Sequence, residues 1–174
     1  PPLSVFYSVW FDRIVPLLLF QSSNDPEKLT SLKDYVSRMK EGQEAIYYIT
    51  ADGFAAARNS PHLEIFRKLG VEVLLLSDPI DEWMVSALTE FEGKPLHSVA
   101  KGDLDLSKLG GDVPKSDLSA AEEHKALLDR MQAVLKERAA AVRATERLTD
   151  SPACLVSDEH GPSTNLERIL KAAG

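Results

Sequence analysis

Two aspartates follow two apolar stretches of this 174-residue chain and could do chemistry together. Asp52 follows residues 45–50, and Asp78 follows residues 71–76. If those stretches are parallel strands of one sheet, both carboxylates lie at its carboxyl edge, where ligands of open α/β sheets bind. A small α/β enzyme that uses Asp52 and Asp78 is therefore one hypothesis. Aspartate is also common in turns and helix caps, so both residues can instead serve the backbone alone.

Motifs for other chemistry do not occur in the sequence. It has no glycine-rich phosphate loop and no Walker motif. No two of the four histidines have the one-turn spacing of a zinc-protease helix; they are His62, His97, His124 and His160. The single cysteine, Cys154, rules out a disulfide framework and a cysteine-rich zinc site. Its apolar surroundings indicate a small buried residue, and we expect no cofactor-binding or metal-binding residue in the chain.

The sequence pattern leaves the placement of Trp83 open. Ile80, Trp83 and Leu88 recur at helical spacing, which is typical of a face that packs in the core. Tryptophan is also enriched in exposed interaction sites, so Trp83 can instead contact a partner. The apolar stripe of residues 127–135 has the same two interpretations, a core helix or a face that binds another protein.

The elements that would position these residues alternate between helix and strand. Strands are predicted at residues 45–50 and 71–76 and, as a possible edge strand, at 95–100. Helices are predicted at residues 30–40, 54–58, 60–69 and 80–91, with Gly70 ending the third. This alternation predicts an α/β fold in which helices cover both faces of a parallel sheet.

The composition changes after residue 100. Residues 101–119 lack apolar periodicity and contain Gly110, Gly111 and Pro114, so they are predicted to form a linker. Beyond it, a helix is predicted at 120–138, short strands at 141–148 and 153–156, and a last helix, capped by Ser163 or Thr164, to residue 171. The sequence thus predicts a layered α/β/α segment, residues 1–100, followed by a small α+β segment, residues 120–174.

Composition and charge exclude several classes of partner. The chain is 44% hydrophobic and 27% charged, which is ordinary for a globular protein. Its 27 acidic and 20 basic residues give a net charge of -7, which argues against a nucleic-acid partner. No apolar run approaches the roughly 18 residues of a membrane span, so no membrane partner is expected. The start, Pro1-Pro2, does not look like a signal peptide and suggests a fragment or a processed product.

Several long strings, in the same order along the chain, resemble the ninety-kilodalton heat-shock chaperones, most closely their bacterial branch. They are YVSRMKEGQEAIYYITAD (35–52), SPHLEIFRKLGVEVLLLSDPIDEW (60–83), LTEFEGKPL (88–96), RLTDSPACLVSD (147–158) and NLERILKAAG (165–174). The resemblance runs from about Asp12 to Gly174, while residues 1–11 do not match the family pattern.

The resemblance implies a domain assignment and a set of partners. Residues 1–100 would be the later part of the family's middle domain, and residues 120–174 the beginning of its carboxyl-terminal domain without the dimerisation helices. The parent would be a cytoplasmic homodimer that uses ATP and Mg²⁺ in an amino-terminal domain and binds unfolded or partly folded client proteins. This chain would be monomeric and have no catalytic residue.

Two residues carry the family's client contact by this resemblance. Trp83 matches the exposed tryptophan that helps to bind client in the bacterial branch. Ser86 lies where that branch often has asparagine, so it differs from the family pattern at a client-binding position. The linker, residues 101–119, lacks the methionine and leucine stripe of a second client surface, and no residue of it is assigned.

The chain should not hydrolyse ATP, because it has no phosphate-binding glycine motif and the resemblance places the nucleotide domain elsewhere. A coupled assay on the purified chain is expected to show background turnover only. Saturable hydrolysis that copurifies with the chain and disappears in Asp52→Ala would instead support the enzyme hypothesis.

Overall fold

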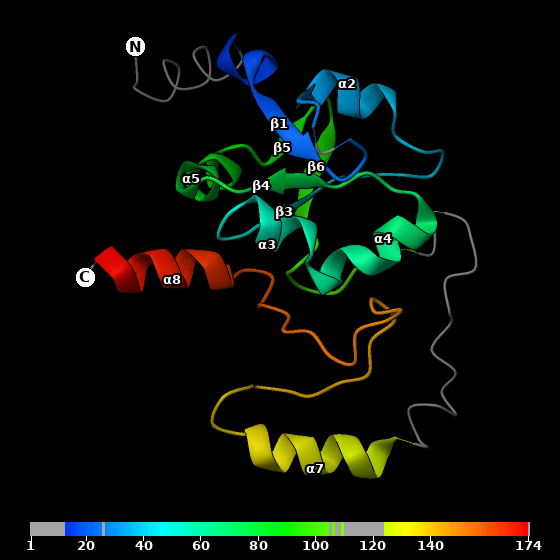
Figure 1. The fold of residues 1–174 in the computed structure, drawn as a ribbon, viewed down its shortest axis with the longest axis vertical. Coiled ribbons are helices and arrows are strands. Elements are labelled where there is room, and N and C mark those ends of the chain that lie inside the picture. Colours follow the sequence, from blue (N-terminus) through cyan, green and yellow to red (C-terminus); the bar gives the residue numbers. More distant parts are fainter. Residues whose placement is uncertain (1–12, 26, 105, 107–108, 110–123, 174) are drawn as a thin grey trace.

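The computed structural model describes residues 13–25, 27–104, 106, 109 and 124–173. In these ranges the chain forms a mixed α/β fold around a six-stranded sheet (Figure 1). None of the helices in the described ranges is long and apolar enough to cross a membrane. In chain order the elements are η1 (Val15–Leu17), β1 (Leu19–Ser22), β2 (Thr30–Ser31), α2 (Leu32–Ser37), β3 (Ile46–Thr50), α3 (Phe54–Arg58), η2 (Pro61–Leu63), α4 (Glu64–Leu69), β4 (Leu74–Leu76), α5 (Pro79–Ala87), β5 (Glu90–Phe91), β6 (Lys94–Ser98), α7 (Lys125–Leu135) and α8 (Thr164–Ala173).

The sheet is mixed rather than wholly parallel. Its strand order is β2-β1-β4-β3-β6-β5, and β3 runs parallel to both of its neighbours, β4 and β6. The other pairs are antiparallel. The strand predicted at 95–100 is formed as β6, but it is not an edge strand, because β5 pairs with its outer side. Glu92 and Gly93 join them with φ of 50° and 74°, the backbone that a tight hairpin requires.

The central strands are buried on both faces, which explains their continuous apolar sequence. Successive side chains of a strand point to opposite faces. Tyr47 and Ile49 pack with α3 and α4 in one apolar cluster, which includes Phe66. Ile46 and Tyr48 belong to a second cluster with residues of α2 and α5. The predicted strand at 45–50 and its burial are confirmed.

Local capping signals in the sequence correspond to real helix ends. The Ser31 hydroxyl accepts a hydrogen bond from the Asp34 N–H at 3.1 Å at the start of α2. Gly70 ends α4 in the left-handed conformation, with φ of 62°. The strand predicted from residue 71 begins only at Leu74, because the Val73 N–H donates to the Ser23 hydroxyl instead of to a strand.

The carboxyl-terminal part differs from the prediction. The strands expected at 141–148 and 153–156 are not formed, and Ser157, just after the second range, makes an isolated bridge with Lys101. The Leu155 carbonyl and the turn at 149–151 bond instead to side chains of the sheet unit, as the next section shows. No residue of α7 is buried within the described structure, so its apolar stripe is not a core face there. Most of the predicted linker, and residues 120–123, lie outside the described residues, and the domain boundaries stay a prediction.

One buried hydroxyl group connects α2 to the sheet. The Tyr35 hydroxyl donates to the Glu72 carbonyl at 2.7 Å and accepts from the Tyr47 N–H and the Gln43 side chain, both at 3.0 Å. Burial raises the pKa of this phenol above its ordinary value, so it stays protonated and able to donate.

Replacing Tyr35 by Phe should lower the free energy of unfolding by about 1–3 kcal/mol, the cost of leaving buried polar groups unpaired. Urea denaturation measures the change. Tyr48→Phe is the matched control, since Tyr48 is also largely buried but its hydroxyl forms no hydrogen bond with the described residues. Equal losses in the two variants would contradict the role given to the Tyr35 hydroxyl.

Candidate functional site

Helix α5 presents Trp83 to solvent. The helix begins with Pro79 at its first position, and the Asp78 N–H donates to the Asp81 carboxylate at 3.0 Å. Met84 and Val85 pack against the apolar cluster behind the helix. Trp83 retains 50% of its surface and Ile80 68%. Of the two placements that the pattern allows, the structure therefore has the exposed one, and Ile80 does not belong to the core face.

Ser86 lies one turn after Trp83 on the same helix. Its side chain is exposed, and its hydroxyl donates to the Trp83 carbonyl at 2.7 Å. The Ser86 proton is thus used within the helix, while the oxygen remains able to accept a hydrogen bond from outside. The two residues assigned by resemblance are close together on one exposed helix face.

A groove of about 350 Å³ lies between α5 and the start of α8. Val85 and Ser86 line it from α5, and Pro162 and Leu166 line it from the start of α8. Residues of β3 also contribute, so the groove joins the sheet unit to the carboxyl-terminal segment. Figure 1 shows α8 beside α5, and the two helices are in contact.

Glu82, which precedes Trp83, is buried and bonds to α8. It retains only 6% of its surface. Its Oε1 atom accepts from the Ser163 hydroxyl at 2.7 Å and from the Asn165 side-chain amide at 2.9 Å. A buried carboxylate is stable only when such donors replace water, so these contacts fix where α8 begins.

The network continues from α8 to the turn after β3. Arg168 donates to the Asn165 side-chain oxygen at 3.2 Å and forms an ion pair with Asp52 at 2.7 Å. Asp52 is exposed, so the pair contributes little to stability by itself. Asp78 is exposed on a separate turn, and neither aspartate lines the groove. Nothing in this geometry supports an enzyme site built on Asp52 and Asp78.

Glu64 holds the turn at residues 149–151. Its carboxylate accepts from the backbone N–H groups of Thr149, Asp150 and Ser151 at 2.7, 2.9 and 3.2 Å, and from the Ser151 hydroxyl. The backbone hydrogen bond from Asp150, the Ser151 hydroxyl and the Thr149 N–H together lower the pKa of Glu64 from 4.5 to about 2. The sheet unit thus binds the backbone that lies between the two predicted strands.

Three further side chains make the same kind of contact. Arg147 is buried and donates to the carbonyls of Val99 and Gly102. Lys101 donates to the Gly161 carbonyl at 2.8 Å. The His62 ring lies 3.0 Å from the Leu155 carbonyl, and burial lowers the pKa of this histidine. The junction is therefore largely made of polar side chains bonded to backbone groups.

The surroundings of Cys154 do not activate its thiol. Burial raises the pKa of the Cys154 thiol above its ordinary value, which disfavours the nucleophilic thiolate. In the described ranges, His, Cys, Asp and Glu form no cluster that could hold a metal ion.

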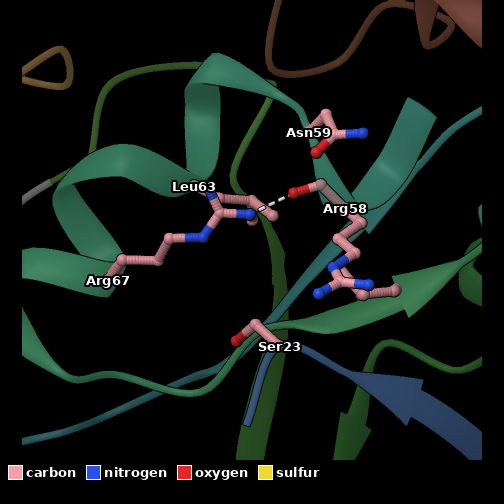
Figure 2. A pocket seen from close by; sticks show the side chains of 6 residues that line it. Ser23, Arg58, Asn59, Leu63 and Arg67 are labelled. Carbon is pink, nitrogen blue, oxygen red and sulfur yellow. Dashed lines mark hydrogen bonds between the residues drawn. The ribbon is translucent and has the colours of Figure 1, made fainter. Parts of the chain in front are cut away.

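A second depression, of about 410 Å³, lies between β1, β4 and the helices α3 and α4. Figure 2 shows the guanidinium groups of Arg58 and Arg67 at its sides, with Arg67 bonded to the Arg58 carbonyl and Ser23 below. Both arginines are exposed. With exposed arginines at its sides, the depression is open to solvent, and we assign it no ligand.

The comparisons with known proteins decide the family. A sequence model described as "Hsp90 protein" matches residues 9–174. The chain belongs to the Hsp90 family. It is 59% identical to the chaperone protein HtpG of Aromatoleum aromaticum, 57% to that of Dechloromonas aromatica and 56% to that of Methylococcus capsulatus. Each comparison covers 94% of this chain but 26% of the relative, so the chain spans about a quarter of the length of these relatives.

The family assignment confirms the resemblance found in the sequence. The match begins at residue 9, slightly before the first residue that the motifs indicated. Sequence reasoning missed Glu82 and Asn165 as contact residues, although Ser163 was predicted as a helix cap. The Ser163 cap is confirmed, since its hydroxyl accepts from the Leu166 N–H at 2.9 Å. No local pattern indicates that Glu82 is buried, because burial depends on α8.

Acidification should release the turn at 149–151 only at a pH well below the ordinary pKa of a carboxyl group. Glu64 has a lowered pKa, so its contribution is complete above 4.5 and is lost as pH falls toward about 2. The amide resonances of Thr149 and Asp150, followed by NMR, are expected to titrate with a midpoint near the lower value. Glu64→Gln should remove that titration. A midpoint at the ordinary carboxyl value would show that Glu64 does not hold the turn in solution.

Proposed function

We propose that this chain binds unfolded or partly folded client proteins as part of an Hsp90-type chaperone. The observation that carries the proposal is the half-exposed Trp83 on a helix whose other large apolar side chains, apart from Ile80, face the core. Trp83 would act as an apolar anchor and Ser86 as a nearby polar contact. The groove between α5 and α8 would receive neighbouring side chains of the client.

The composition of the groove supports this proposal. Val85, Pro162 and Leu166 offer apolar surface, and the Ser86 oxygen can accept a hydrogen bond from a client backbone. Its volume of 350 Å³ is small and suits a few side chains of an extended segment rather than a folded surface. Exposed apolar patches rimmed by polar groups are typical of protein-binding sites.

The remaining proposals concern a longer protein. By the resemblance, the parent would be a cytoplasmic homodimer whose amino-terminal domain binds and hydrolyses ATP with Mg²⁺. Nothing among the described residues is assigned to ATP or Mg²⁺. The names of the HtpG relatives describe them as chaperone proteins, which supports a chaperone role for the parent. The chain by itself would be monomeric at micromolar concentration.

Trp83→Ala should weaken client binding about tenfold, the factor that about 1.4 kcal/mol represents. A tryptophan that buries its remaining half loses about 75–125 Å² to the client, which is worth at most about 2–3 kcal/mol. Ordering a mobile client offsets part of this gain. Fluorescence anisotropy with labelled, reduced and carboxymethylated α-lactalbumin measures the affinity.

The same variant should lower the free energy of unfolding by only about 1 kcal/mol, because half of the side chain is already exposed. Val134→Ala on α7 is the matched control, since it truncates an exposed apolar side chain on another helix. An affinity that stays unchanged in Trp83→Ala, or falls equally in Val134→Ala, would refute the anchor role.

A further inference from the structure

Consecutive residues of α5 face opposite environments. Trp83 is half exposed, whereas Glu82 retains only 6% of its surface and bonds to the start of α8. A charged side chain is rarely buried unless it is paired. The two hydrogen-bond donors to Glu82 are Ser163, which caps α8, and Asn165 in the first turn of that helix. The burial of Glu82 therefore depends on its contacts with the start of α8.

In this contact Glu82 is the acceptor, and Ser163 and Asn165 are the donors. The Ser163 hydroxyl donates its single proton to Glu82 at 2.7 Å. The same hydroxyl oxygen then accepts from the Leu166 N–H at 2.9 Å and caps α8. Hydrogen bonds in such a chain polarise one another, so Glu82 strengthens the cap. We call Glu82, Ser163 and Asn165 the Glu82 contact.

The Glu82 contact lies at the groove. Glu82 and Val85 line the groove from α5, and Leu166 lines it from the first turn of α8. The groove exists only while the start of α8 stays beside α5. Apart from the exposed Arg168–Asp52 ion pair, which lies on the second turn of α8, the other polar contacts of the junction hold residues 147–161.

From this geometry we infer that Glu82 is a positioning residue for client binding. It acts through Ser163 and Asn165, which keep α8 beside α5 and thereby complete the surface next to Trp83. The inference rests on the proposed client-binding function. It differs from a direct role, in which the Glu82 carboxylate would itself contact the client.

Variants of the two partners separate these roles. Glu82→Ala removes the acceptor, whereas Glu82→Gln keeps an oxygen acceptor in the same place without the charge. Asn165→Ala removes one donor from the α8 side. Glu90→Ala, an exposed carboxylate on β5, is the matched control. Each variant of this chain is measured for affinity to carboxymethylated α-lactalbumin and for amide hydrogen exchange along α8.

Glu82→Ala should weaken client binding about tenfold, which corresponds to about 1.4 kcal/mol, and speed exchange in α8 by a similar factor. Glu82→Gln should restore most of both properties. Asn165→Ala should cause a smaller loss of the same kind. Because it also removes the exposed hydrogen bond from Arg168, adding it to Glu82→Ala should cause a further loss that is clearly smaller than the loss in Asn165→Ala alone. Asn165→Ala carries the test by itself if Glu82→Ala does not fold.

Three outcomes would overturn the inference. Weaker binding in Glu82→Ala with unchanged exchange in α8 would show a direct client contact. Faster exchange with unchanged affinity would show that the contact is structural only. Additive losses in the double variant would show that Glu82 and Asn165 act separately. Failure of the proposed function is recognised independently, because Trp83→Ala would then leave the affinity unchanged while α8 still depended on Glu82.

Discussion

The rest of the fold depends on the need to cover β3 and β4 on both faces. These strands place large apolar side chains alternately on opposite sides of the sheet, so each face loses water only when helices pack on it. Helices α3 and α4 cover one face. On the other, α5 contributes Met84 and Val85, and the next residues around the helix necessarily point elsewhere.

That packing requirement accounts for the difference between Trp83 and Glu82. With 3.6 residues per turn, neighbours on a helix point in directions about 100° apart. Once Met84 and Val85 face the sheet, Trp83 lies toward solvent and Glu82 lies toward α8. An exposed tryptophan and a buried carboxylate are thus two consequences of one helix orientation.

The junction with the carboxyl-terminal segment has a different physical character. Glu64 and Lys101 bond to backbone groups of that segment, and Arg147 of the segment donates in turn to the carbonyls of Val99 and Gly102. Directional hydrogen bonds of this kind specify one position more strongly than apolar contact does. Their net contribution is modest, because water can replace the same partners when the segment leaves. The groove between α5 and α8 is therefore positioned by directional hydrogen bonds rather than by a large buried core.

The sequence by itself determined the features that depend on neighbouring residues: the buried strand at β3, the caps at Ser31 and Ser163, the stop at Gly70 and the family. It predicted strands at 141–148 and 153–156 wrongly, because the local pattern does not show that distant side chains bond to the Leu155 carbonyl and to the turn at 149–151. Only the tertiary structure decided that Trp83 is exposed, that β6 has two neighbours, and that Glu82 is buried. The physical reason is sequence separation: Glu82 and Ser163 are 81 residues apart, and Glu64 and Asp150 are 86 apart, so no local pattern encodes these contacts.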